Sequence, residues 1–129
     1  MKYPQPALWR CALIDVHDGD TITVHVDKGG VNESTEIWHI RLKDIYAPEL
    51  SQPGGPESRD NLRTLLQNAN DGSLWPYMLQ TFRTPLSDLD LMTFNRYVGT
   101  IWGADNVQIN AVQETWIKSQ GYSGGIGSK

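Results

Sequence analysis

The sequence predicts a mainly β protein with helices, a five-stranded Greek-key β-barrel of the OB-fold type, with one helix between strands three and four and a second, C-terminal helix. Two observations predict this fold class. Apolar and polar residues alternate along 22–26 and again along 38–42, which is the period of a strand that buries one face. The elements follow one another as three strands, a helix, two strands and a helix, and this order suits such a barrel.

The first three strands are expected to form an antiparallel meander. An apolar segment, 8–16, ends at the turn residues Asp18 and Gly19. A strand over 21–27 is then closed by a Lys-Gly-Gly hairpin, and a third strand follows over 36–45. The residues expected to point into the barrel are Ile22, Val24, Val26, Trp38, Ile40 and Leu42.

The second half of the chain contains both helices. A proline and an acid at 56–57 predict the start of a helix that runs to residue 68. A strand over 74–82 has Pro76 near its start, which favours an edge position, and a fifth strand covers 97–102. The last helix, 109–119, is expected to bury Ile109, Val112, Trp116 and Ile117, and we expect Trp75, Trp102 and Trp116 in the core.

Composition limits the class of protein. The chain has 129 residues, which predicts one domain over 1–121 followed by a flexible glycine-rich tail over 122–129. Its only cysteine, Cys11, cannot form an internal disulfide, and its position in an apolar run indicates a buried side chain. We expect a cytoplasmic monomer, because the sequence shows no signal peptide and no membrane-spanning segment. A net charge of −4 argues against a broad basic surface for nucleic acid.

Several side chains are of the types that phosphodiester hydrolysis requires. Carboxylates can hold a hard cation, and arginines can clamp a phosphate with two parallel hydrogen bonds. The candidate acids are Asp18, Asp20, Asp44 and Glu49, and the candidate clamps are Arg41, Arg83 and Arg96. Each residue alone has an ordinary explanation, such as a hairpin turn or a solvated strand residue. Their combination is more specific than any one of them.

The combination resembles the staphylococcal nuclease (thermonuclease-like) family. The segments that carry the resemblance are DVHDGDTITV, IRLKDIYAPE, FNRYVGTIW and VQINAVQETWIKSQG, in that order, and they cover roughly residues 11–121. The resemblance implies an OB barrel and calcium-dependent cleavage of DNA or RNA on the 5′ side of the phosphate. It also implies that Asp20 binds calcium and that Asp18 supports the metal-bound waters. Arg41 and Arg96 become phosphate clamps, and Glu49 orients or deprotonates the attacking water.

The chain departs from the family pattern at Tyr46, where the family has a second metal-binding carboxylate. A neutral phenol is a poor ligand for Ca²⁺, so Mg²⁺ or Mn²⁺ is expected to compete better at this site. Asp44, two residues earlier, is the candidate replacement ligand. We assign further substrate contacts to Tyr46, Arg83 and Tyr97. The predicted function is a nuclease with an altered metal site, and the alternative is a catalytically impaired OB module that binds single-stranded nucleic acid or a protein partner.

Overall fold

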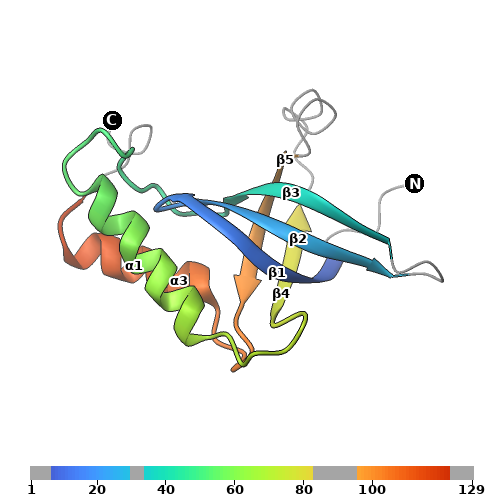
Figure 1. Ribbon diagram of the computed structural model, residues 1–129. Coiled ribbons are helices and arrows are strands. Elements are labelled where there is room, and N and C mark those ends of the chain that lie inside the picture. The colour runs from blue at the N-terminus through green and yellow to red at the C-terminus, as the bar shows by residue number, and fades with distance from the viewer. Residues whose placement is uncertain (1–6, 30–33, 83–95, 123–129) are drawn as a thin grey trace.

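A computed structural model describes residues 7–29, 34–82 and 96–122 of the chain, and Arg96 by its backbone alone. The elements in chain order are β1 (Ala7–Asp18), β2 (Thr21–Gly29), β3 (Ser34–Leu42), α1 (Gly55–Asn68), β4 (Tyr77–Phe82), β5 (Arg96–Trp102) and α3 (Ile109–Ser119) (Figure 1). Arg83, a candidate clamp and substrate contact, lies outside the described residues.

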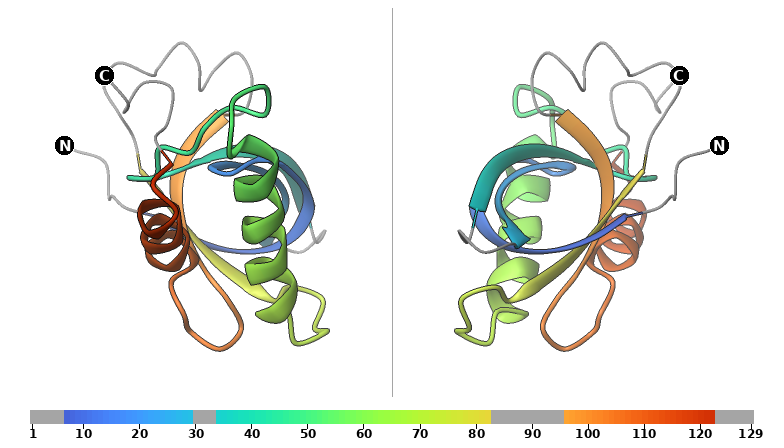
Figure 2. Two further views of the ribbon diagram at one scale, coloured as in Figure 1. Left: turned by 90° about the vertical axis from the view of Figure 1, so that its left-hand side faces the viewer. Right: turned by 90° about the vertical axis from the view of Figure 1, so that its right-hand side faces the viewer.

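The five strands close into one barrel with the order β1-β2-β3-β5-β4, and β1 completes the ring by pairing with β4. Neighbouring strands are antiparallel except β3 and β5, which run parallel. Figure 2 looks along the barrel from both ends and shows α1 crossing one of them. The predicted five-stranded, mainly β barrel with helices is therefore confirmed.

The predicted edge position of the fourth strand is wrong. β4 is bonded to β1 on one side and to β5 on the other, because closing the barrel removes every edge among these strands. Pro76 is compatible with this arrangement because it lies just before β4 begins at Tyr77 and has no N–H to contribute to the ladder.

The core lies inside the barrel and under α1. The alternating residues predicted to point inward on β2 and β3 are all buried: Ile22, Val24, Val26, Trp38, Ile40 and Leu42. Leu62 and Leu66 of α1 are fully buried and close one end of the barrel. Cys11 is also buried, as predicted, and burial raises the pKa of its thiol to about 12. Trp75, Trp102 and Trp116, which were predicted to lie in the core, are only partly buried, and of these Trp116 packs against the core.

Helix α3 presents a different face from the one predicted. Ile109 and Ile117 are buried as expected, but Val112 is exposed, and the buried positions between them are the amides Asn110 and Gln113. Tyr122, which we assigned to the flexible tail, lies against the ring of Trp116 at 5.8 Å between centroids. The packed part of the chain therefore extends through Tyr122. No helix in the described part of the chain is long and apolar enough to cross a membrane.

Candidate functional site

The turn between β1 and β2 holds two carboxylates in a tight conformation. The backbone N–H of Asp20 donates to Oδ1 of Asp18 at 3.2 Å. Between them, Gly19 is pressed against two other segments, because a Cβ at this position would lie 2.6 Å from Cβ of Ala47 and 2.7 Å from Cβ of Ser58. Only glycine allows this approach, and the turn is thereby fixed on α1 and on the loop after β3.

The carboxylate of Asp20 faces that loop rather than open solvent. Its Oδ2 accepts a hydrogen bond from the backbone N–H of Ala47 at 3.1 Å, and its Oδ1 accepts one from the hydroxyl of Thr21 at 3.1 Å. The guanidinium of Arg41 is also close, with Nη2 3.9 Å from Oδ2. Asp20 is 8% exposed, so these partners replace most of its water.

The electrostatics of this carboxylate are unfavourable despite its partners. Burial, followed by the neighbouring Asp18 carboxyl, raises the pKa of Asp20 from 3.8 to about 6. The Ala47 N–H and the Arg41 guanidinium act in the opposite direction and offset only part of this. An acid with such a raised pKa beside a second acid is a common arrangement at functional sites.

Arg41 and Tyr46 form a contact at the surface next to Asp20. Arg41 pairs with Thr21 across the β2–β3 ladder, which brings it beside the turn. Its Cζ lies 5.6 Å from the centroid of the Tyr46 ring, within the range of a cation–π contact. The Tyr46 side chain is 45% exposed, although its neighbours Ile45 and Ala47 are buried. The backbone at Tyr46 is therefore held between two buried residues while its ring meets solvent.

Two buried amides of α3 hold the segments that carry these side chains. Gln113 donates from Nε2 to the carbonyl oxygens of Gly19 at 3.0 Å and Ser58 at 2.9 Å. Its Oε1 accepts from Asn61 at 2.7 Å. Asn110, three residues earlier, donates to the carbonyl oxygens of Lys43 and Gly99, both at 3.1 Å. The first amide fixes the β1–β2 turn, and the second fixes the start of the loop that leads to Tyr46.

Sequence reasoning placed Asn110 only in the family pattern and missed Gln113. Both residues are polar, so a search for an apolar helix face passes over them. The signal that could have found Gln113 is spacing, because positions 109, 113 and 117 are four residues apart and lie on one buried face of the helix.

Glu49 lies two residues beyond Ala47 and is exposed. Its backbone is fixed by Gln52, whose side-chain Oε1 accepts from the N–H of Glu49 at 2.8 Å and whose own N–H donates to the carbonyl of Glu49 at 2.8 Å. The loop is packed closely enough on α1 that a side chain at Gly55 would overlap this carbonyl. The Glu49 carboxylate is thus presented to solvent from a well-anchored loop.

The other predicted residues occupy different places. β3 ends at Leu42 rather than near Ile45, and Asp44 has a positive φ of 66° with its carboxylate 3.0 Å from Nζ of Lys43. The strand therefore does not continue through Asp44 to Tyr46, and the carboxylate of Asp44 has a cation beside it. The ring of Tyr97 contacts Trp38, at 4.4 Å between centroids. The backbone of Arg96 pairs with His39, two residues before Arg41 on β3.

The carboxylates fit a weakly held hard cation better than a calcium cage. Asp20 and Asp18 are adjacent, and each oxygen of Asp20 keeps lone-pair capacity beyond the one hydrogen bond described for it. Within the described residues there is no group of three His, Cys, Asp or Glu side chains that could hold a metal ion. Ca²⁺ takes about 6–8 oxygen ligands, whereas Mg²⁺ is usually held by one or two carboxylates, water and substrate phosphate. The donor set therefore fits Mg²⁺ or Mn²⁺ better than Ca²⁺.

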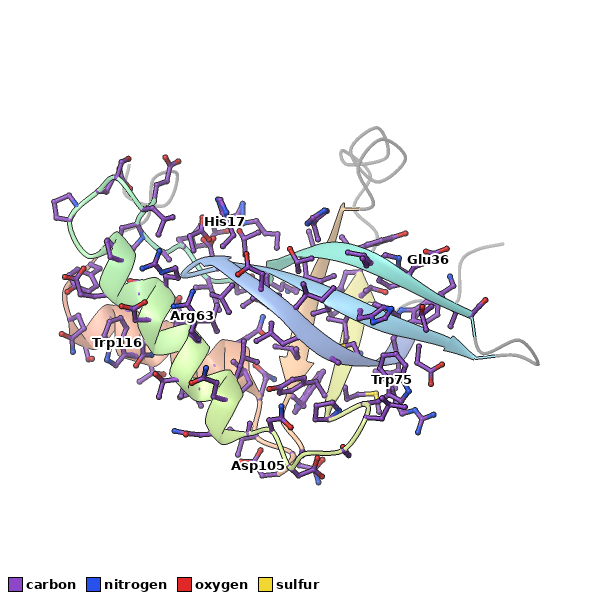
Figure 3. The ribbon with its side chains drawn as sticks, in the orientation of Figure 1. His17, Glu36, Arg63, Trp75, Asp105 and Trp116 are labelled. Atoms are coloured by element: carbon purple, nitrogen blue, oxygen red, sulfur yellow. The ribbon has the colours of Figure 1, made fainter. Side chains whose placement is uncertain are left out.

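The two ends of the barrel differ in the side chains they carry. We call the β1–β2 turn with residues 41–49 the acidic end, and Trp9, Lys28, Glu36 and Trp38 the aromatic end. In Figure 3, His17 lies near the β1–β2 turn beside α1, and Glu36 lies toward the other end of the strands. The seven residue steps of β2 from Thr21 to Lys28 correspond to about 23 Å.

Comparison with known proteins adds no relative to these observations. No family model matches the chain, and no curated protein matches it.

Proposed function

We propose that the acidic end hydrolyses phosphodiester bonds of DNA or RNA, in the manner of the staphylococcal nuclease family that the motifs resemble. The observation that supports the proposal most strongly is the short distance between the charged groups of Asp20 and Arg41. A carboxylate on the β1–β2 turn and a guanidinium on β3 lie 3.9 Å apart. The same carboxylate is bonded to a loop 27 residues away in sequence. A structural ion pair has no need of the neighbouring Asp18 or of the raised pKa of Asp20.

The roles of the protein groups follow from their chemistry. Arg41 is half-exposed and can offer two parallel N–H donors to a phosphate, as a lysine cannot. Glu49 accepts the proton of the water that attacks phosphorus, and its anchored backbone keeps the carboxylate at the loop surface. Arg96, on the strand beside β3, supplies the second clamp. Asp20 and Asp18 would hold a divalent cation, which when bound relieves negative charge on the phosphate.

A second candidate function is nucleic-acid binding without hydrolysis. Tyr46 stands at the position where the resemblance implies a carboxylate, and it favours this candidate. A module that binds but does not cut would keep Arg41 for phosphate and could lose a metal ligand without loss of function. It would not require Glu49.

Cleavage assays with different metal ions test the proposal. Purified protein is incubated with circular plasmid, single-stranded DNA and RNA in EDTA, Ca²⁺, Mg²⁺ or Mn²⁺. We expect cleavage in Mg²⁺ or Mn²⁺, less in Ca²⁺, and none in EDTA. The matched variant is Glu49→Gln, which keeps the size of the side chain and removes the base. It should lower the rate by about 10²–10⁴-fold.

The outcome also separates the two candidates. If no metal ion supports cleavage but single-stranded DNA is bound, the binding function replaces the nuclease. If Glu49→Gln cuts at the wild-type rate, the assignment of the base is wrong.

A further inference from the structure

We propose that Tyr46 and Arg41 form a stacking platform for a nucleobase beside the phosphate site, so that this site selects single-stranded DNA or RNA over a duplex. This inference rests on the proposed function, because it assigns the substrate class of the same site.

The first support is that Tyr46 has an exposed ring on a backbone held by buried neighbours. Its ring is 45% exposed, yet the residues on either side are almost completely buried. Ala47 is in addition bonded through its N–H to Asp20. An aromatic ring on such a fixed backbone loses little conformational freedom when a ligand stacks on it. Leu74, which is 78% exposed, lies between α1 and β4 and outside this turn and loop.

The second support is the contact with Arg41. The guanidinium lies 5.6 Å from the ring centroid and 3.9 Å from Asp20. One strand of nucleic acid could therefore place its phosphate on Arg41 and its base on Tyr46. Bases in a duplex are already stacked on one another and would first have to unpair, whereas a single strand offers its base faces at little cost.

The third support is the charge of the chain. With a net charge of −4, the protein gains little long-range attraction for a phosphate backbone. Stacking supplies affinity that does not depend on counterion release. The rings at the aromatic end are less suitable for this purpose, because Trp38 is buried and the ring of Trp9 contacts Trp38 and Nζ of Lys28.

Binding measurements in EDTA test the platform without any cleavage. The probes are a short fluorescent oligothymidine and a labelled DNA hairpin. Tyr46→Leu removes the ring and should weaken oligothymidine binding by about 5- to 150-fold, the equivalent of ~1–3 kcal/mol per stacked base. Hairpin binding should change by less than about two-fold, the equivalent of ~0.4 kcal/mol. Tyr46→Phe keeps the ring and should restore most of the lost affinity, and Leu74→Ala is the control for loss of exposed apolar surface.

The results that overturn the platform differ from those that overturn the nuclease. Equal loss for both probes, no loss in Tyr46→Leu, or wild-type protein that binds neither probe would each refute the platform. If the protein cuts DNA while Tyr46→Leu binds oligothymidine normally, the nuclease stands without the platform. If the Tyr46 series behaves as expected but no metal ion supports cleavage, the platform stands and the nuclease does not.

Discussion

The acidic and aromatic ends of the barrel differ in how well their polar groups are satisfied. At the aromatic end, Lys28 lies over the rings of Trp9 and Trp38, with Nζ 5.0 and 5.3 Å from their centroids. Each indole N–H there has a side-chain acceptor, Thr81 or Glu36. At the acidic end, the carboxylate of Asp20 is buried next to Asp18, and both effects raise its pKa to about 6.

The difference separates an end whose polar groups are satisfied from an end that holds unfavourable charges, which is the end to which we assign the proposed function. Ring packing and satisfied N–H groups stabilise the aromatic end. The acidic end holds charges that repel each other, and it does so with hydrogen bonds from α3 and from the loop after β3. Residues that lower stability but are firmly positioned are characteristic of functional sites.

The largest expected effect on stability is at Gln113. Gln113→Leu leaves the buried carbonyl groups of Gly19 and Ser58 without their donor and removes the acceptor of Asn61. We expect a loss of about 3 kcal/mol in the free energy of unfolding, measured by urea denaturation. The control is Gln67→Leu on the exposed side of α1, which should change stability by less than ~0.5 kcal/mol. A loss no larger than the control would mean that Gln113 does not brace the turn.

Asp20→Asn should stabilise the protein at neutral pH. The pKa of Asp20 is 3.8 in the unfolded reference and about 6 in the fold, so the folded state binds more protons between these values. Its contribution to stability is therefore lost as pH rises through this window, by up to about 3 kcal/mol. Asparagine has no such titration. The difference in unfolding free energy between variant and wild type, measured in EDTA, should grow from pH 4 to pH 7; a constant or shrinking difference would contradict the raised pKa.

Tyr46→Asp tests what the phenol replaces. It places a carboxylate where the resemblance implies a metal ligand and should raise cleavage in Ca²⁺ by about ten-fold, the equivalent of ~1.4 kcal/mol, because a charged oxygen ligand strengthens a hard-cation site. Calcium titrations of cleavage by the two proteins provide the measurement. No gain would mean that the site uses a ligand set other than Asp20 and Asp18, with Asp44 the first residue to examine.

The smallest effect is expected at the aromatic end. Lys28→Met keeps the aliphatic stem over Trp9 and Trp38 and removes the charge, so the cation–π contribution of about 0.5–1 kcal/mol should be lost from the unfolding free energy. Urea denaturation at low salt measures it. A loss larger than that in Gln113→Leu would reverse the proposed difference between the two ends.

The sequence predicted the barrel well because β2 and β3 each contain a stretch that alternates. Residues 22–26 and 38–42 show a period of two, and every residue predicted to point inward on β2 and β3 is buried. The predictions were wrong where tertiary contacts determine the position of an element. Pro76 suggested an edge, yet strand closure is a property of the whole barrel and leaves no local trace.

At the candidate site, the motifs identified the turn and Arg41, but not what supports them. Val112 is apolar and exposed, and Gln113 is polar and buried, because the amide satisfies carbonyl groups from two other segments. Hydrophobicity cannot reveal such a partner. Hydrophobicity likewise does not reveal that β3 ends at Leu42. This end depends on the hydrogen bond from the Lys43 N–H to the carbonyl of Gly99 and on the positive φ of Asp44.

Cleavage by one matched pair of variants tests most directly whether chemistry belongs to the acidic end. Arg41→Met and Lys28→Met make the same kind of change, from a cation to an apolar chain, at opposite ends of β2 and β3. In Mg²⁺ or Mn²⁺ with single-stranded DNA, Arg41→Met should lower kcat/KM by about 10²–10³-fold, as expected for loss of a phosphate clamp. Lys28→Met should stay within about two-fold, the equivalent of ~0.4 kcal/mol. A wild-type rate in Arg41→Met, or an equal loss in Lys28→Met, would contradict the assignment.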